Sequence, residues 1–193
     1  MNDYFKYDDK QLIALLREKN PIKNEAFNIL YYRYSERLKS YCLFKTDNKE
    51  DAKELHQETW LKFFSVVKSG INAISLPSFL YTIARNICID KYRIKSNHLV
   101  IYSDYFDYEN ISDSFSLQTN IENRELLTLI SLSLNQLSEI YRESFILRWF
   151  AGLTFREIAT IVDESEECVK KRSLRAMDEI LKILQPYILE IKE

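Results

Sequence analysis

The chain has 193 residues, with 27 basic and 29 acidic side chains and a formal net charge of −2 at pH 7. Only two glycines and three prolines occur, so the tight turns that a β-rich fold requires are scarce. The slightly acidic balance argues against a free-standing, non-specific DNA-binding protein, whose affinity depends on positive charge. Any affinity for DNA must therefore come from local basic patches or be supplied largely by a partner.

Several other classes of protein are disfavoured by the residues that are missing. Cys42, Cys88 and Cys168 are far apart and form no CxxC pair, so we expect buried thiols and neither a disulfide framework nor a zinc site. Only His56 and His98 occur, and no glycine-rich phosphate loop is present, so we expect no enzyme, no metal and no cofactor. We expect His56 to be a surface or interface residue and not a metal ligand. No apolar run reaches roughly 18 residues and no signal-peptide core begins the chain, which predicts a cytoplasmic protein without membrane insertion.

The N-terminal half predicts four amphipathic helices, because apolar residues recur at steps of three and four. Asp8 or Asp9 is expected to cap the first helix and Asn24 the second. The third is expected to start at 47–48 and end at Gly70, and the fourth to begin near Pro77. The four apolar stripes are Leu12, Ile13, Leu15 and Leu16; Phe27, Leu30, Tyr31, Tyr34, Leu38 and Tyr41; Ala52, Leu55, Trp60, Phe63 and Val67; and Leu80, Ile83, Ala84 and Ile87.

The third and fourth predicted helices carry opposite charges on their polar surfaces. The third has Glu50, Asp51, Glu54 and Glu58, a set that would repel DNA and suits a protein partner. The second half of the fourth is basic, and aromatic side chains lie beside the charges. Basic groups can follow a phosphate backbone, and aromatic rings can stack on unpaired bases. The alternative is that the aromatics are core residues and that the basic end only compensates the helix dipole.

From about residue 96 to 120 the helical periodicity fades. Residues 102–125 hold six acidic residues and one basic residue, a net charge of −5. We interpret 96–120 as an acidic linker between two helical domains.

A helix-turn-helix is predicted after this linker. Gly152 can end one helix, since glycine adopts the left-handed cap conformation at little cost. Thr154 and Glu157 form a capping box that starts the next helix. Residues 163–164 then break the helix, and Ser165 caps its successor. The helices are expected to run to about Leu184 and to end at Pro186.

The last helix of this motif carries the basic residues that could contact DNA. A helix that follows such a turn can enter the major groove and present side chains to phosphates and base edges. The residues concerned are Lys170, Lys171, Arg172 and Arg175. The plain alternative is a helical hairpin with a solvated, charged face.

Three segments together resemble a known family. They are EDAKELHQETWLKFF (50–64), SFLYTIARNICIDKYRIK (78–95) and LSEIYRESFILRWFAGLTFREIATIV (137–162). The chain resembles the sigma factors of bacterial RNA polymerase, and its two-domain layout is similar to that of the extracytoplasmic-function (ECF) group. The resemblance implies a promoter-melting and polymerase-binding domain (sigma region 2) at 1–95, the linker at 96–120, and a helix-turn-helix promoter-binding domain (sigma region 4) at 121–193.

The resemblance also implies the partners, which are core RNA polymerase and promoter DNA, both duplex and single-stranded. It assigns the start-proximal promoter element to the loop 70–77 and to the fourth helix, and core polymerase to the third helix. The start-proximal residues are Phe79, Tyr81, Arg85, Asn86, Lys91, Tyr92, Arg93 and Lys95. Those for core polymerase are Glu54, Gln57, Glu58 and Leu61. Those for the upstream element are Arg148, Lys170, Lys171, Arg172, Leu174 and Arg175. Anti-sigma factors are common partners in the family, and the sequence leaves open whether this chain has one.

The chain departs from the family at the turn of the helix-turn-helix. Asp163 and Glu164 stand where relatives have Gly and an aliphatic residue, and Glu166 and Glu167 occupy the first turn of the recognition helix, where they oppose phosphates. Ser173 stands where an aliphatic core residue is common. We therefore expect weak or unusually specific upstream binding. Two alternatives remain, namely a LuxR-like transcriptional regulator and a polymerase-binding regulator without promoter activity.

Overall fold

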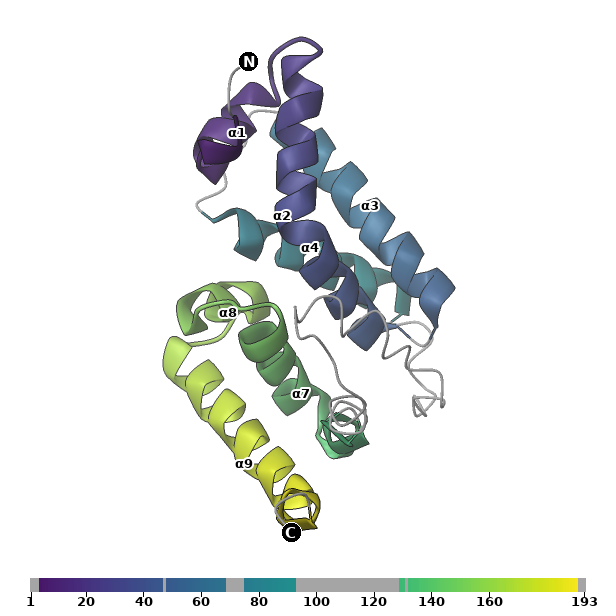
Figure 1. Ribbon diagram of the computed structural model, residues 1–193, viewed down its shortest axis with the longest axis vertical. Coiled ribbons are helices and arrows are strands. Elements are labelled where there is room, and N and C mark those ends of the chain that lie inside the picture. Colours follow the sequence, from purple (N-terminus) through teal and green to yellow (C-terminus); the bar gives the residue numbers. More distant parts are fainter. Residues whose placement is uncertain (1–3, 47, 69–74, 93–128, 131, 191–193) are drawn as a thin grey trace. The chain divides into compact units, whose positions relative to one another are not determined.

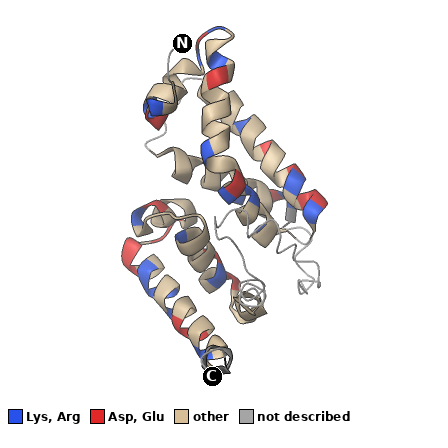
Figure 2. Cartoon of the chain, viewed as in Figure 1, with Lys and Arg blue, Asp and Glu red and all other residues tan. Residues whose placement is uncertain are grey.

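A computed structural model describes residues 4–46, 48–68, 75–92, 129–130 and 132–190 of the chain (Figure 1). Within these ranges every regular element is a helix. The chain divides into two compact units, Met1–Asn97 and His98–Glu193. Acidic and basic residues are interspersed over the helices of both units (Figure 2). The predicted all-α fold with two helical domains is confirmed.

The first unit is a helical bundle built around α2 (Ile22–Lys45). This helix packs against α1 (Asp9–Leu15), α3 (Lys49–Lys68) and α4 (Leu76–Tyr92), and α3 also packs against α4. The predicted stripes of the third and fourth helices are buried in full, as are Leu30, Leu38 and Tyr41 of α2. Burying these side chains provides the main stabilisation of the bundle.

The sequence predicted capping residues for the first three α-helices of this unit. Two of these helices, α1 and α3, begin at the predicted cap. Asp8 forms a capping box with Gln11 at the start of α1. Asn48 precedes α3 and accepts from the Asp51 N–H at 2.8 Å. The expected cap at Asn24 is wrong, since α2 begins earlier, after Pro21, without a side-chain cap. Proline can occupy the start of a helix because the first N–H groups have no intrahelical partner there.

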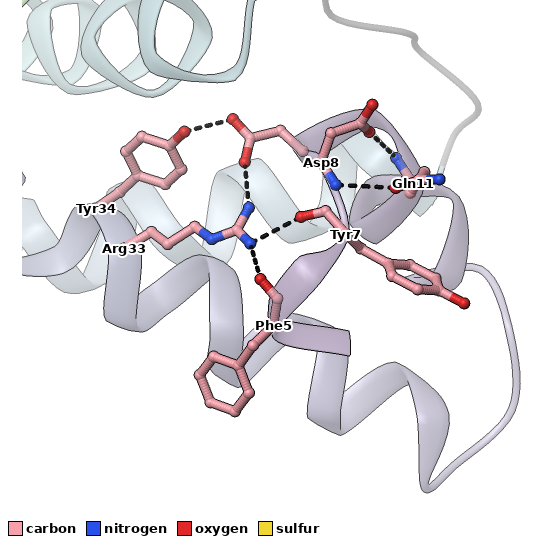
Figure 3. Close-up of polar contacts among 7 residues, drawn as sticks. Phe5, Tyr7, Asp8, Gln11, Arg33 and Tyr34 are labelled. Atoms are coloured by element: carbon pink, nitrogen blue, oxygen red, sulfur yellow. Dashed lines mark hydrogen bonds and ion pairs between the residues drawn. The ribbon is translucent and has the colours of Figure 1, made fainter. Parts of the chain in front are cut away.

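Arg33 fastens the N-terminal segment to α2 (Figure 3). Its guanidinium donates to the backbone carbonyls of Phe5 at 2.8 Å and Tyr7 at 2.7 Å, and to the Asp9 carboxylate at 3.0 Å. Tyr34 donates to the same carboxylate. The short 3₁₀ helix η1 (Tyr4–Lys6) and α1 are therefore held on α2 by charge-assisted hydrogen bonds as well as by apolar packing.

The second unit contains a helical segment at 132–136, then α7 (Glu139–Phe145), a π-helical turn η2 (Ile146–Phe150), α8 (Phe155–Val162) and α9 (Glu166–Glu190). α9 packs against both α7 and α8. This order and packing are those of the predicted helix-turn-helix, with α8 and α9 as its two helices.

The turns of this motif have the predicted backbone geometry. Gly152 has a φ of 74°, which glycine adopts without steric penalty. Thr154 and Glu157 form the capping box of α8. Asp163 is left-handed, with φ 56° and ψ 52°, a conformation that Asp tolerates better than most residues. Ser165 accepts from the Cys168 N–H at 3.2 Å.

Two expectations about the second unit are wrong. The helix does not end before Pro186, because α9 continues through it to Glu190. The proline ring fixes a φ close to the helical value, so it removes one hydrogen bond without forcing the chain out of the helix. Cys168 is partly exposed, whereas Cys42 and Cys88 are buried as expected. Across the described residues, no helix combines the length and apolar character needed to span a bilayer.

Candidate functional site

The four residues predicted to bind polymerase share one outer face of α3. Glu54, Gln57, Glu58 and Leu61 follow one another at helical steps of three, one and three, which places them on neighbouring turns of the same side. Gln57 is exposed, and Leu61 is 64% exposed despite its apolar side chain. An exposed leucine beside acidic and amide groups is a surface suited to a protein partner.

His56 lies behind this face and corrects an expectation, since it was predicted to be a surface or interface residue. It is buried, and the Trp60 indole donates to its Nε2 at 3.2 Å, with the Ser35 hydroxyl 3.1 Å from the same nitrogen. Burial lowers the pKa of His56 to about 4. A neutral imidazole therefore ties α3 to α2.

The predicted start-proximal residues of α4 divide between surface and core. Asn86 is exposed and Arg85 is half-buried. Tyr81 is only 2% exposed, and its ring meets that of Tyr41 edge-on at 5.2 Å. Its predicted role in stacking on a DNA base is therefore contradicted, because a side chain packed between α4 and α2 offers no free ring face. Burial also raises the pKa of Tyr81.

Phe79 and Lys91 occupy intermediate positions. The Phe79 ring is half-buried and lies 6.2 Å from that of Phe63, so part of it belongs to the core. Lys91 forms ion pairs with Glu54 at 2.8 Å and with Glu58 at 2.5 Å. The hydrogen bonds to Glu54 and then to Glu58 raise the pKa of Lys91.

Other predicted start-proximal residues lie outside the described part of the chain. These are residues 70–74 of the loop, the side chain of Tyr92, and Arg93 and Lys95. Residues 75–77 are described. Ser75 precedes α4, and its hydroxyl accepts from the Ser78 N–H at 3.4 Å. The linker at 96–120 also lies outside the described residues.

The recognition helix α9 exposes four of its predicted DNA contacts. Lys170, Lys171, Leu174 and Arg175 are exposed. Acidic residues stand at the start of the helix and basic residues follow them (Figure 2). Lys171 pairs with Glu167 at 2.6 Å, with both side chains largely exposed. Ser173 is buried, and its hydroxyl finds no hydrogen-bond partner among the described residues, so it fills an apolar core position at a cost.

Two arginines that were predicted to contact the upstream element form contacts within the protein. Arg148 donates to the Leu153 carbonyl at 2.8 Å, and its guanidinium lies 4.9 Å from the centre of the Phe155 ring. Arg172 is partly buried and pairs with Glu164 at 2.7 Å. Arg148 thus bonds across the entry to α8, and Arg172 bonds across the turn before α9.

Sequence reasoning missed two contacts near the recognition helix. The Tyr141 hydroxyl accepts from Arg175 at 3.4 Å, across 34 positions of sequence. The Arg172 guanidinium donates to the carboxylate of Glu164, which lies eight residues earlier in the chain. Neither separation is a spacing at which residues of one helix meet, so no local pattern signals either pair.

Comparison with known proteins gives matches in both units. The model "Sigma-70 region 2" matches residues 30–97, and "Sigma-70, region 4" matches residues 133–180. The ferric citrate uptake sigma factor FecI of Escherichia coli (strain K12) is 30% identical over 157 residues, covering 81% of this chain and 89% of that protein. The RNA polymerase sigma-H factor of Pseudomonas aeruginosa is 24% identical over 196 residues, covering 94% of this chain and 96% of that protein.

Two solved structures share the fold. CnrH, solved in complex with the cytosolic domain of CnrY, has a TM-score of 0.66 at 19% identity, covering 92% of this chain and 97% of that chain. The sigma factor RpoE from Bartonella quintana, solved with the anti-sigma factor NepR, has a TM-score of 0.63 at 19% identity, covering 83% and 98%.

These findings define a two-domain, DNA-binding subunit of a transcription complex. The chain belongs to the sigma-70 family, within its ECF group. It is a sigma factor, which binds core RNA polymerase, recognises two promoter elements and melts the start-proximal one to initiate transcription. The region 2 match decides against the LuxR-like alternative. Sigma factors are not enzymes in the catalytic sense.

Proposed function

We propose that the chain divides its work among three segments. The first domain, residues 1–95, binds core polymerase and melts the start-proximal element. The second domain, residues 121–193, binds the upstream element, and the linker at 96–120 connects the two domains. The observation that carries this proposal is the alignment of Glu54, Gln57, Glu58 and Leu61 on one outer face of α3. Acidic groups there attract a basic protein surface and repel DNA, and Leu61 supplies apolar contact area.

The start-proximal surface is proposed to lie on the exposed side of α4. Asn86 and Arg85 contact the strand, and the accessible part of Phe79 stacks on a base. The loop 70–77, Tyr92, Arg93 and Lys95 complete this surface. Tyr81 is left out because it is buried. Stacking on an aromatic ring offsets the cost of unstacking a base, about 1–3 kcal/mol per base.

The upstream surface is proposed to consist of Lys170, Lys171, Leu174 and Arg175. Their exposure on the recognition helix supports this assignment. Arg148 and Arg172 act differently, because they hold the entry and the turn that set the angle of α9. Both guanidinium groups are already hydrogen-bonded within the protein. They therefore contribute to DNA binding mainly by holding α9 in position, and less by a direct contact with DNA.

We further propose that the protein works in the cytoplasm and is controlled by an anti-sigma factor. The similarity of its fold to RpoE, solved with an anti-sigma factor, and to CnrH, solved with the cytosolic domain of CnrY, supports the second part. Co-purification of a protein that blocks core binding would test it.

The docking surface is tested by truncating one exposed apolar residue. Leu61→Ala is expected to weaken binding to core polymerase about tenfold, as expected for an interface residue that costs about 1–2 kcal/mol on truncation. Phe5→Ala is the matched control, since Phe5 is 67% exposed and Leu61 64%, and Phe5 lies in a different element. Equal core affinity for wild type and Leu61→Ala would contradict the assignment.

A further inference from the structure

The ammonium group of Lys91 joins the two candidate surfaces of the first unit. Its Nζ donates to Glu54 Oε1 at 2.8 Å and lies 2.5 Å from Glu58 Oε2. Glu54 and Glu58 belong to the proposed polymerase-docking surface, whereas Lys91 was expected to contact promoter DNA. One side chain thus pairs with two carboxylates to which a basic partner would also bind.

These contacts oppose the binding of a phosphate to Lys91. The ammonium carries one positive charge and the two carboxylates of α3 carry two negative charges, so the cluster as a whole repels an anion. Binding of a phosphate is favoured only when the carboxylates are separated from Lys91 or paired with other cations. The three side chains are 36%, 65% and 39% exposed for Lys91, Glu54 and Glu58, so their ion pairs are solvent-accessible and can be exchanged at low cost.

We propose that Lys91 is exchanged between the two partners of the protein. In the free protein it is paired with Glu54 and Glu58, and docking of a basic polymerase surface on these acids releases it onto a phosphate of the opened promoter strand. This inference rests on the proposed docking surface of α3. By thermodynamic reciprocity, a strand that captures Lys91 strengthens polymerase binding by the same factor.

The first test uses the free, full-length protein and no polymerase. Binding of a fluorescein-labelled oligodeoxythymidylate is followed by anisotropy over a salt series. The double variant Glu54→Gln/Glu58→Gln is expected to bind about two- to fivefold more tightly than wild type, the range set by exposed ion pairs. Its slope of log affinity against log salt is expected to be steeper by about 0.7, which corresponds to one added single-strand phosphate contact.

The same double variant in a Lys91→Met background separates exchange from bulk charge. There the gain is expected to shrink to about the square of the fold-change for Glu50→Gln, because this control removes one exposed acid of α3 and the double variant removes two. Glu50 makes no ion pair with Lys91 in the described structure. An equal gain with and without Lys91, or no gain in either background, would overturn the proposal.

The second test measures the affinity of Lys91→Met for core polymerase. Loss of the internal competitor is expected to tighten binding about two- to fivefold, and Lys91→Arg, which keeps the charge, is expected to behave as wild type. Weaker binding by Lys91→Met would identify Lys91 as a staple between α4 and α3 and overturn the exchange. Lys91→Gln serves if Lys91→Met does not fold.

The two hypotheses fail in different ways. If the docking surface is misplaced, Glu54→Gln/Glu58→Gln binds core polymerase as tightly as wild type. The oligonucleotide experiment contains no polymerase, so its result concerns only the exchange.

Discussion

Ion pairs join acidic and basic residues at the start of α9, on the proposed upstream surface. Lys171 is paired with Glu167, and Arg172 with Glu164. Glu166 is exposed and forms no ion pair with a described residue. On the proposed upstream surface each acid would oppose a DNA phosphate, and Glu167 would also occupy a cation, Lys171, that the phosphate could otherwise bind.

Glu167→Gln is expected to raise the affinity of the holoenzyme for its promoter about two- to fivefold, because it frees Lys171 as well as removing a negative charge. Glu166→Gln is the matched control and should raise affinity less. Electrophoretic mobility shifts at fixed salt measure both. A fall in affinity for Glu167→Gln would show instead that this carboxylate reads a base, such as a cytosine amino group.

The buried His56 predicts how stability depends on pH. Its pKa is about 4 in the folded protein, below the ordinary value of roughly 6.5. Below pH 6.5 the unfolded chain therefore binds a proton that the folded chain rejects, and the free energy of unfolding falls until about pH 4. The loss is as much as about 3 kcal/mol, at about 1.4 kcal/mol per pKa unit.

Urea unfolding between pH 7 and pH 4 measures this effect, with His56→Gln as the comparison. The variant is expected to be less stable at pH 7, because the Trp60 and Ser35 contacts are altered. It is also expected to lose less stability on acidification. Identical pH profiles for the two proteins would show that His56 titrates normally.

Burial decided which predicted site residues could be assigned from the sequence. The surface residues Asn86, Lys170 and Arg175 lie where they were expected. Tyr81 and His56 do not, because a tyrosine or histidine with three- and four-residue neighbours fits a core stripe as well as a binding surface. The sequence allows both interpretations, core and surface. Only the position of the neighbouring helix, which covers these side chains, decides between them.

At the scale of elements, helix starts were predictable wherever a side chain forms the cap. Asp8, Asn48 and Thr154 each have a local hydrogen-bonding pattern that the sequence exposes. The start of α2 at Ile22 and the passage of α9 through Pro186 were not predictable, because packing rather than a cap sets them.

The turn between α8 and α9 gives a prediction for the whole motif. Asp163 is left-handed, so Asp163→Val is expected to destabilise the second unit by about 1–2 kcal/mol. Asp163→Gly should fold with little change, because glycine accepts this conformation freely. Urea unfolding monitored by circular dichroism compares the two, and equal stabilities would contradict the strain argument.

At the scale of the whole molecule, the sigma factor carries three different surfaces on two compact units. The first unit has an acidic face on α3 and a polar face on α4, and the second has the recognition helix. The all-α class and the motif order could be read from the sequence, because hydrophobic period and caps are local properties. Ion pairs such as Lys91 with Glu54 could not, because they join residues far apart in the chain.

The acidic linker provides a prediction at this scale. If its negative charge fits a positively charged channel of the polymerase, deleting 104–115 should reduce transcript initiation much more than promoter binding. A deletion that affects neither would show that the linker is only a tether. Replacing the acidic residues of this segment with the corresponding amides keeps the length of the linker and removes its charge. This variant therefore distinguishes the effect of linker charge from the effect of linker length.

The sigma activity of the chain is measured by reconstitution with purified core polymerase, followed by mapping of transcript starts on a genomic library. Transcript starts are expected only when this chain and the core enzyme are both present, and these starts are expected to share two motifs at a fixed spacing. Failure to associate with the core enzyme, or binding of the same DNA sites without it, would show that the chain does not work as a sigma factor.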